Sequence, residues 1–371
     1  MVKTLIKIFN LIVFPFTIIF GLLLMLSGQV APFSPQINSF LPLIGLAFPV
    51  LFVINLCFLI YWLIQLKWKS LIPAAFFLFN LGQMSLYFQW NSAPEFQSRP
   101  QDLCKVVTYN ANLFGVFTIG WKQDSVLQMI RTENADIICL QEVYAKNETM
   151  MSLIQRMKKH CNYPYGVVYK LNENRPYGMM ILSKYKIDKW ARISFGENTG
   201  NMAMWVDVKM PSVEMNTLRT VRIYNVHLQS FRFNKTDYKT IEKVNSDKEI
   251  DKEKTDGLIT RMKLAYEKRA EQTDILSNAI KECKIPKIVV GDFNDVPVSY
   301  TYRKVCDNLG DAFVKCGRGL ERTYKGPFPS FRIDYILYSD PITCVKYNSR
   351  SNVPSDHKLV SATFKVDQLF Y

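Results

Sequence analysis

The sequence predicts an α/β domain of mixed β-sheets, preceded by three transmembrane helices. Two observations lead to this fold class. First, residues 1–100 hold only five of the 46 basic and one of the 32 acidic residues of the 371-residue chain. Second, the remainder alternates short apolar runs with amphipathic helical patterns, which is typical of α/β proteins. We therefore expect an apolar part followed by a folded soluble part.

The apolar part contains no charged residue from Ile8 to Leu66. A Pro-, Gly- and Ser-rich stretch at 27–39 interrupts it, and another apolar run follows Lys69. About 20 apolar residues cross a bilayer as a helix. We expect three spans, at about 5–26, 40–64 and 71–90. The first has a signal peptide as its alternative, because lysines precede it. Buried helices of a soluble core are disfavoured, because these runs lack polar faces.

Basic residues set the expected orientation. Lys3 and Lys7 precede the first span, and Lys67 and Lys69 separate the second span from the third. Because basic loops stay on the cytoplasmic side, we expect a multi-pass protein of the cell membrane, with the lipid bilayer as a partner. The soluble part then faces the non-cytoplasmic side. The expected organisation is a membrane domain at 1–90, a linker at 91–102 and a soluble domain at 103–371.

Eight runs rich in β-branched and aromatic residues predict strands in the soluble domain. They are Cys104–Tyr109, Asp136–Leu140, Met179–Leu182, Met204–Val208, Val221–Val226, Lys287–Val290, Ile333–Leu337 and Leu359–Phe364. Three helices are predicted between them, at Ser125–Glu133, Thr149–His160 and Arg261–Lys281. Several strands look half-exposed, which favours mixed sheets over a purely parallel one. The charged stretch 235–254 is expected to be a solvated loop.

Polar side chains follow these strands. In chain order they are Asn110, Asn112, Gln141, Glu142, Asn225, His227, Asp292, Asn294, Asp295, Asp334, Asp356 and His357. Any one of them alone is more often a turn residue, a cap or hydrogen-bonded filler than a functional group. However, Glu142 directly follows an apolar strand and is costly there without a partner, and two of the three histidines lie beside carboxylates or amides. Together they predict one shared site.

The motifs resemble those of the endonuclease/exonuclease/phosphatase superfamily. In the expected order they are YNxN at 109–112, LQE at 140–142, NxHL at 225–228, GDFND at 291–295, RIDYIL at 332–337 and SDH at 355–357. The resemblance covers about 103–366 and makes 103–371 a catalytic domain. It implies the deoxyribonuclease I-like fold, a four-layer sandwich of two mixed β-sheets flanked by helices. The apolar lead-in resembles membrane-anchored bacterial members.

The resemblance also implies the chemistry of the site. A Mg²⁺-dependent hydrolase of phosphate esters is expected, with Mn²⁺ as a substitute, and hard oxygen ligands favour the same ions. The implied metal ligands are Glu142, Asn112 and Asp356. The implied catalytic residues are His227, Asp292, Asn294, Asp334 and His357, of which Asp292 orients or deprotonates the attacking water and Asp334 pairs with His357. The implied substrate-binding residues are Asn110 and Asn225.

The chain departs from the family pattern at three places. Many members carry Asp where this chain has Asn112, which puts a strong second metal site in doubt. The tyrosine between the second and third motifs has three candidates, Tyr165, Tyr169 and Tyr177. His227 has no carboxylate partner that can be identified from the sequence.

The expected function is a membrane-tethered, metal-dependent phosphodiesterase. Residues 101–371 hold 41 basic and 31 acidic residues, which slightly favours nucleic acid as the substrate of an endonuclease or exonuclease. The tether favours the alternative, a lipid phosphodiesterase or phosphatase of sphingomyelinase-like or phosphoinositide type. An inactive binding module is disfavoured because the acidic and histidine residues are all present. A transporter is disfavoured because the spans carry no charge that would mark an ion path. The sequence indicates no protein partner.

Overall fold

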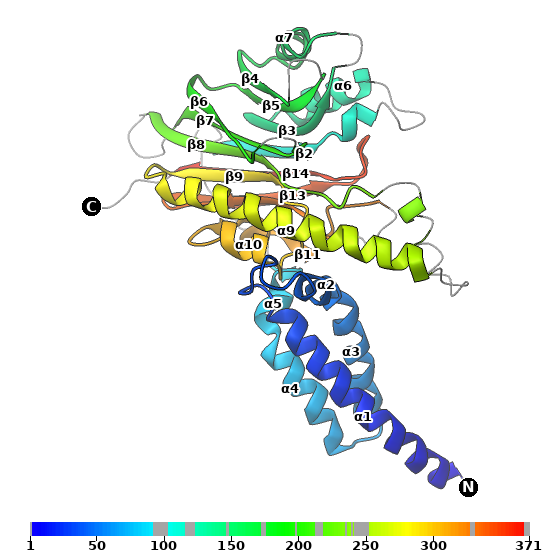
Figure 1. Ribbon diagram of the computed structural model, residues 1–371. Helices are drawn as coiled ribbons and strands as arrows, with labels where there is room; N and C mark the ends of the chain where they lie inside the picture. The colour runs from blue at the N-terminus through cyan, green and yellow to red at the C-terminus, as the bar shows by residue number, and fades with distance from the viewer. Residues whose placement is uncertain are drawn as a thin grey trace.

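The computed structural model places a helical bundle below a β-sandwich that carries helices on its outer faces (Figure 1). The residues that it describes are 2–91, 103–115, 123–145, 148–171, 176–196, 199–211, 218–233, 236–238, 240, 252–326 and 331–366. The expected linker at 91–102 therefore lies outside the described residues, except for its first residue.

Two six-stranded sheets form the sandwich. Across the first sheet the strands are β13 (Ile342–Arg350), β14 (Leu359–Val366), β2 (Leu103–Asn110), β3 (Ile137–Tyr144), β5 (Tyr177–Ser183) and β4 (Tyr165–Lys170). Across the second they are β10 (Gly310–Asp311), β12 (Asp334–Tyr338), β9 (Lys287–Asp292), β8 (Leu218–His227), β7 (Met202–Pro211) and β6 (Ile187–Ile193). Each sheet has one parallel pair, β2 with β3 and β8 with β9, among antiparallel neighbours. Both sheets are mixed, as predicted.

The layers are held by three apolar cores. Val106 and Ile181 of the first sheet meet Ile223 of the second in the core between the sheets. On the outer face of the first sheet lie α6 (Gln123–Glu133) and α7 (Met150–Cys161). On the outer face of the second lie α9 (Lys252–Glu282) and α10 (Tyr300–Val305). Burial on both faces of each sheet gives the four-layer sandwich.

The three predicted helices of the soluble domain correspond to α6, α7 and α9. The last of these begins at Lys252 rather than Arg261, so the end of the charged stretch 235–254 is helical and not a loop. Residues 241–251 lie outside the described residues. The sequence did not predict strand β13. Its second half is mostly polar and charged, with exposed and half-buried residues in alternation, so it lacks the apolar run by which the other strands were recognised.

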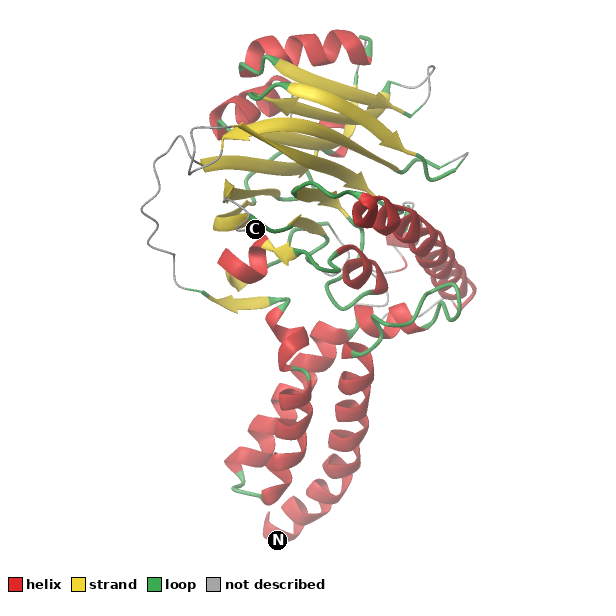
Figure 2. Ribbon diagram, turned by 90° about the vertical axis from the view of Figure 1, so that its left-hand side faces the viewer, coloured by secondary structure: helices red, strands yellow, loops and turns green. Residues whose placement is uncertain are grey.

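The bundle consists of α1 (Val2–Gly28), α3 (Phe48–Ile64) and α4 (Leu71–Phe79), which lie side by side (Figures 1 and 2). Short helices α2 (Leu41–Leu46), η1 (Trp68–Ser70) and α5 (Leu81–Ser85) join them to one another and to the sandwich. Among the described residues, one helix is long and apolar enough to cross a membrane, over Thr4–Gly28.

The expectation of three full-length spans is not confirmed. The second predicted span is divided at Ala47 into α2 and α3, and Pro49 lies in the first turn of α3, where the missing N–H costs least. The third predicted span is divided at Asn80, whose side chain donates to the carbonyl of Phe76 at 2.9 Å. Local hydrogen bonding and proline placement therefore shorten both helices.

Polar side chains join α1 to α3 inside the bundle. Trp62 Nε1 donates to Thr17 Oγ1 at 2.9 Å, and Asn55 Nδ2 donates to the carbonyl of Phe20 at 2.9 Å. Near the far end, Tyr61 Oη donates to Asn10 Oδ1 at 2.5 Å. In an apolar environment such bonds hold helices together, because the alternative is an unsatisfied polar group.

The bundle is also fastened to the sandwich. Strand β1 (Phe88–Trp90), which follows α5, pairs antiparallel with β11 (Arg318–Leu320). The ring of Tyr87 stacks on that of Phe48 at 5.5 Å between centroids. Both rings pack against Val296 and Ile333, which follow β9 and precede β12. Main-chain pairing and this apolar packing therefore fix the bundle against one end of the sandwich.

Candidate active site

The predicted site residues meet at one edge of the two sheets. Asn110 ends β2, His227 ends β8 and Asp292 ends β9. Asp334 begins β12 directly opposite Asp292, because the two strands run antiparallel. A cavity of about 250 Å³ opens there, and six predicted residues line it: Asn112, Glu142, Asp292, Asn294, Asp356 and His357.

Glu142 reaches this cavity through a β-bulge. Leu140 pairs with Met180 and Val143 pairs with Gly178, so Gln141 and Glu142 together face one residue of β5. Glu142 has a φ of 50°, in the left-handed region that non-glycine residues seldom adopt. Bulges of this kind re-aim a side chain. Burial raises the pKa of the Glu142 carboxyl, although Asn110 Nδ2 lies 3.3 Å from Oε1.

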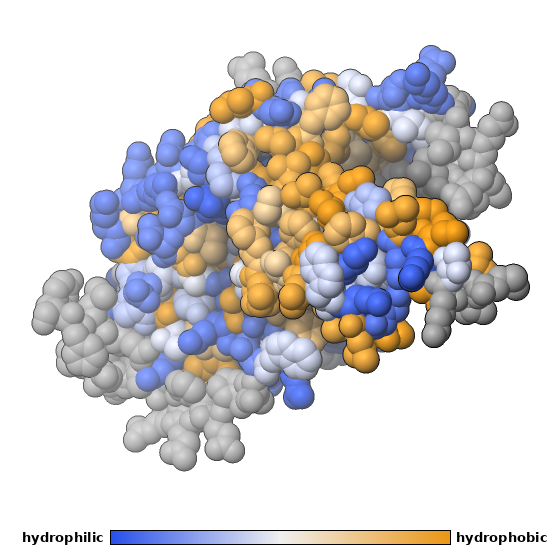
Figure 3. Space-filling model, turned by 90° about the horizontal axis from the view of Figure 1, so that it is seen from below, coloured by the Kyte–Doolittle hydropathy of each residue, from blue (hydrophilic) through white to orange (hydrophobic). Residues whose placement is uncertain are grey.

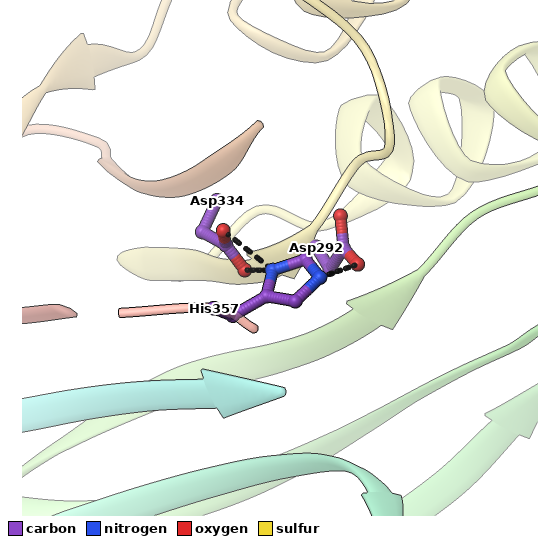
Figure 4. Close-up of side chains that lie close together, drawn as sticks. All are labelled: Asp292, Asp334 and His357. Atoms are coloured by element: carbon purple, nitrogen blue, oxygen red, sulfur yellow. Dashed lines mark hydrogen bonds and ion pairs between the residues drawn. The ribbon is translucent and has the colours of Figure 1, made fainter. Parts of the chain in front are cut away.

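Asp334, His357 and Asp292 form a chain of buried groups (Figure 4). His357 Nδ1 lies 2.9 Å from Asp334 Oδ2, and His357 Nε2 lies 3.7 Å from Asp292 Oδ2. Burial lowers the pKa of His357, but the charges of Asp334 and Asp292 outweigh it and raise that pKa well above 6.5. Asp334 therefore fixes a proton on Nδ1 and turns Nε2 toward the other carboxylate.

His227 has a different environment. Its two ring nitrogens are buried and make no hydrogen bond among the described residues. The nearest carboxylate oxygens are Glu142 Oε1 at 3.4 Å and Asp292 Oδ2 at 3.9 Å from Nε2. Burial lowers the pKa of His227 below its usual 6.5. The two histidines at this edge are therefore held in opposite electrostatic environments.

The asparagines divide into two groups. Asn112 and Asn294 line the cavity; Asn112 Nδ2 donates to Asp356 Oδ1 at 2.8 Å, and the backbone N–H of Asn294 donates to Asp292 Oδ1 at 2.8 Å. Asn110 is buried behind them and its Nδ2 donates to Asp292 Oδ2 at 3.0 Å. It therefore holds a carboxylate in place instead of facing a substrate as predicted.

Asn225 is the clearest correction to the predicted site. Its Nδ2 donates to the carbonyls of Leu140 and Met180, each at 3.1 Å, and its Oδ1 accepts from Gln141 Nε2 at 2.6 Å. These partners belong to the opposite sheet, and the side chain is fully buried. A sequence alone does not show that a carboxamide at a strand end faces the other sheet. Asn225 thus joins the two sheets and does not contact the cavity.

Gly291 of the GDFND motif permits the strand pairing beneath the site. It has a φ of 144°, and a Cβ there would lie 1.9 Å from the carbonyl oxygen of Val226. This contact holds the parallel strands β8 and β9 in the register that places His227 beside Asp292. Glycine is therefore required for the backbone approach.

The donor set fits a hard divalent cation. Glu142, Asp356 and Asn112 line the cavity with side-chain oxygen atoms, and such oxygens are the ligands that Mg²⁺ and Mn²⁺ prefer. Ligand atoms of Asp292, Asp334 and His357 also lie within 4.8 Å of one another. In that trio, however, the Asp334 carboxylate is committed to the Nδ1 proton of His357. This leaves fewer free oxygen atoms in the trio than in the set that lines the cavity.

Comparisons with known proteins identify the family of the chain. A family model described as "Endonuclease/Exonuclease/phosphatase family" matches residues 107–357, more than half of the chain. The chain belongs to this family. A second model, described as a domain of unknown function, matches residues 8–87, where the bundle lies. A comparison with curated proteins gave no match. Members of the endonuclease/exonuclease/phosphatase family are hydrolases of phosphate esters and generally use divalent metal ions.

Solved structures share the fold at low sequence identity. An endonuclease/exonuclease/phosphatase from Bacteroides vulgatus has a TM-score of 0.51 at 17% identity, with 71% of this chain and 99% of that chain covered. One from Beutenbergia cavernae has a TM-score of 0.50 at 16% identity, with 71% and 72% covered. ANGEL2, described as a 2',3'-cyclic phosphatase, has a TM-score of 0.50 at 16% identity, with 71% and 95% covered.

Two residues near the predicted ones had no sequence signal. The ring of Tyr324 packs edge-on against His357, with centroids 5.3 Å apart, and the buried Arg269 lies 3.1 Å from Asp295. Among the three candidate tyrosines, Tyr177 begins β5 and pairs with Tyr144, two residues after Glu142. Burial, and then the charge of Glu142, raise the pKa of Tyr177.

Proposed function

We propose that the chain is a membrane-tethered, Mg²⁺-dependent phosphodiesterase. The observation that carries the proposal is the meeting of the His357–Asp334 pair with His227, Asp292 and Glu142 at one cavity edge. Paired imidazoles and carboxylates at hydrogen-bonding range are the groups that phosphoester hydrolysis needs for proton transfer. Membership of the endonuclease/exonuclease/phosphatase family supports the reaction class.

Each residue has a proposed role. Glu142, Asp356 and Asn112 would hold Mg²⁺, which supplies charge neutralisation at a non-bridging phosphate oxygen. Asp292 orients the attacking water, and Asn294 fixes Asp292 through its backbone N–H. His357 presents Nε2 to the reacting phosphate because Asp334 occupies Nδ1. His227, with both ring nitrogens unpartnered among the described residues, donates to a phosphate oxygen or to the leaving group.

The tether is proposed from the bundle. Helix α1 is long enough to span a membrane, and α3 and α4 lie beside it with a basic turn, Lys67 and Lys69, at the end away from the sandwich. The positive-inside rule places that end in the cytoplasm and the catalytic domain on the other side. A reporter fused after Tyr371 should be active only if it functions outside the cytoplasm. Activity of a reporter that works in the cytoplasm alone would reverse this topology.

The reaction is tested with a small soluble diester, bis(p-nitrophenyl) phosphate, and full-length protein in detergent. We expect Mg²⁺-dependent release of p-nitrophenol and a loss of about 10²- to 10⁴-fold in His357→Ala. The matched control is His160→Ala, because His160 is exposed on α7 away from the cavity. Equal rates for the two variants would reject the proposed site.

The charge of the catalytic domain favours a nucleic acid substrate, as its excess of basic residues indicates. Oligonucleotides of DNA and RNA belong in the same assay. The apolar residues that line the cavity also bear on the class of substrate.

A further inference from the structure

One wall of the active-site cavity is apolar. It is formed by Leu46, Phe231, Phe233, Val296, Phe331 and Ile333. Leu46 belongs to α2, in the part of the chain that precedes the catalytic domain. A side chain from the N-terminal part of the chain thus contributes to the cavity, which no motif of the catalytic domain indicated.

Leu46 connects the cavity to the bundle. It packs against a cluster in which Leu24 of α1 and Phe48 of α3 meet Val296 and Ile333 of the catalytic domain. It also packs, with Phe231 and Phe233, against Leu258 and Met262 of α9. Apolar surface therefore extends from the top of the bundle into the cavity.

The segment before α2 exposes apolar side chains near the junction of the bundle with the sandwich. Phe33, Ile37 and Phe40 are exposed there, Ile37 by 85%. Lys263 Nζ of α9 lies 4.0 Å from the centroid of the Phe40 ring. Apolar side chains beside a lysine are typical of the boundary between lipid headgroups and acyl chains. The apolar surface gathers over the bundle, whereas hydrophilic surface predominates where the catalytic domain extends beyond it (Figure 3).

The height of the cavity above the bundle is fixed. Helix α1 ends at Gly28, and the β1–β11 pairing and the packing of Phe48 and Tyr87 against Val296 and Ile333 hold the bundle against the sandwich. With α1 across the membrane, as proposed above, a site mounted in this way lies beside the membrane surface. A nucleic acid duplex would instead have to fit between the catalytic domain and the bilayer.

We propose that the substrate is a membrane phospholipid. Its phosphodiester lies against Glu142, Asp292 and His357, and its acyl region lies along Leu46 and Phe233. This inference rests on the proposed phosphodiesterase function. In the reaction, a water oxygen forms a bond to phosphorus and the bond from phosphorus to one of the two alcohols breaks. One water proton passes to the departing alcohol oxygen, and the remaining phosphate monoester keeps the other or releases it to solvent.

The test compares lipid and soluble substrates on the same enzyme. Full-length protein is reconstituted with Mg²⁺ into vesicles of phosphatidylcholine, phosphatidylethanolamine and phosphatidylglycerol, and products are followed by ³¹P NMR. Bis(p-nitrophenyl) phosphate and single- and double-stranded oligonucleotides are assayed in parallel. We expect a phosphate monoester product from at least one of the lipids, formed faster than oligonucleotide cleavage.

Substitutions in the apolar wall test where the acyl region of the lipid binds. In Leu46→Asn, and separately in Phe233→Ser, the ratio of the lipid rate to the soluble-diester rate should fall by about tenfold. Leu218→Asn is the matched control, because Leu218 is exposed at the other end of β8 and its ratio should not change. Because both rates are measured on the same preparation, their ratio does not depend on the amount of folded enzyme.

The outcomes separate the two proposals. Hydrolysis of the soluble diester or of oligonucleotides without lipid hydrolysis overturns the inference and leaves the phosphodiesterase function standing. An unchanged ratio in both wall variants overturns the assignment of the wall to the acyl region. Failure on every phosphate ester overturns the phosphodiesterase function, and the inference with it.

Discussion

The polar and apolar walls of the cavity are built by different parts of the chain. The polar wall comes from strand ends of both sheets, where most side chains have a fixed partner, such as Asp334 for His357 and Asn112 for Asp356. The apolar wall comes from α2, the segment after β8, the turn after β9 and the segment before β12. We propose that the first wall carries out the reaction and that the second selects the substrate.

The largest expected effect is the loss of activity when the metal is removed, and it concerns the polar wall alone. We expect excess EDTA to abolish turnover of every substrate and added Mg²⁺ or Mn²⁺ to restore it. Glu142→Gln removes the charge but keeps the bulge, so it should fold and require a much higher Mg²⁺ concentration for half-maximal rate. The measurement is the rate of soluble-diester hydrolysis against Mg²⁺ concentration. Full turnover in EDTA would show that the oxygen ligands do not hold a required metal.

The second effect tests whether Asp334 and His357 act as a unit. Each single variant, Asp334→Asn and His357→Ala, should lower the rate by about 10²- to 10⁴-fold. Because Asp334 acts through the Nδ1 proton of His357, Asp334→Asn should cost little in the His357→Ala background. Measured rates of the four proteins give the coupling directly.

The comparison for this double-mutant cycle is Asp334→Asn in a His227→Ala background. His227 does not contact Asp334 within hydrogen-bond range, so nearly the full loss should persist. If the losses in Asp334→Asn and His357→Ala multiply instead, the two side chains are independent and Asp334 supports only the start of β12.

Much of the polar wall was predictable from sequence. Strand periodicity located β2, β3, β8 and β9. Because the ends of neighbouring strands meet at one edge of a sheet, the sequence predicted that Glu142, His227 and Asp292 lie close together. The direction in which each side chain points could not be predicted from the sequence. The bulge that turns Glu142 toward the cavity and the bonds that turn Asn225 to the opposite sheet depend on the partner strands. The apolar wall was not predictable, because Leu46 meets Phe233 only through tertiary packing.

The third effect concerns Asn225 and should appear in stability rather than chemistry. Asn225→Ala leaves the carbonyls of Leu140 and Met180 without their amide donor in a buried place. We expect the free energy of unfolding to fall by about 2–3 kcal/mol, with an unchanged turnover per folded molecule. Denaturant unfolding and active-site-normalised rates distinguish the two. A lower turnover with unchanged stability would restore the predicted role of Asn225 as a phosphate ligand.

The smallest effect should come from a hydrogen bond inside the bundle whose two residues line neither wall. Thr17→Val keeps the shape of the side chain but removes the acceptor of the Trp62 Nε1–H, which is buried between α1 and α3. Interhelical hydrogen bonds in membranes contribute about 0.6 kcal/mol on average, so the midpoint of thermal unfolding in detergent should drop slightly. Ser85→Ala is the control, since Ser85 Oγ bonds only within its own turn. The rates of soluble-diester and lipid hydrolysis should stay equal to those of the parent protein, because the fastening of the bundle to the sandwich at β1 and β11 is untouched. If Thr17→Val selectively lowered the lipid rate, the packing of α1 against α3 would itself set the height of the cavity, and the junction at β1 would not be sufficient to fix it.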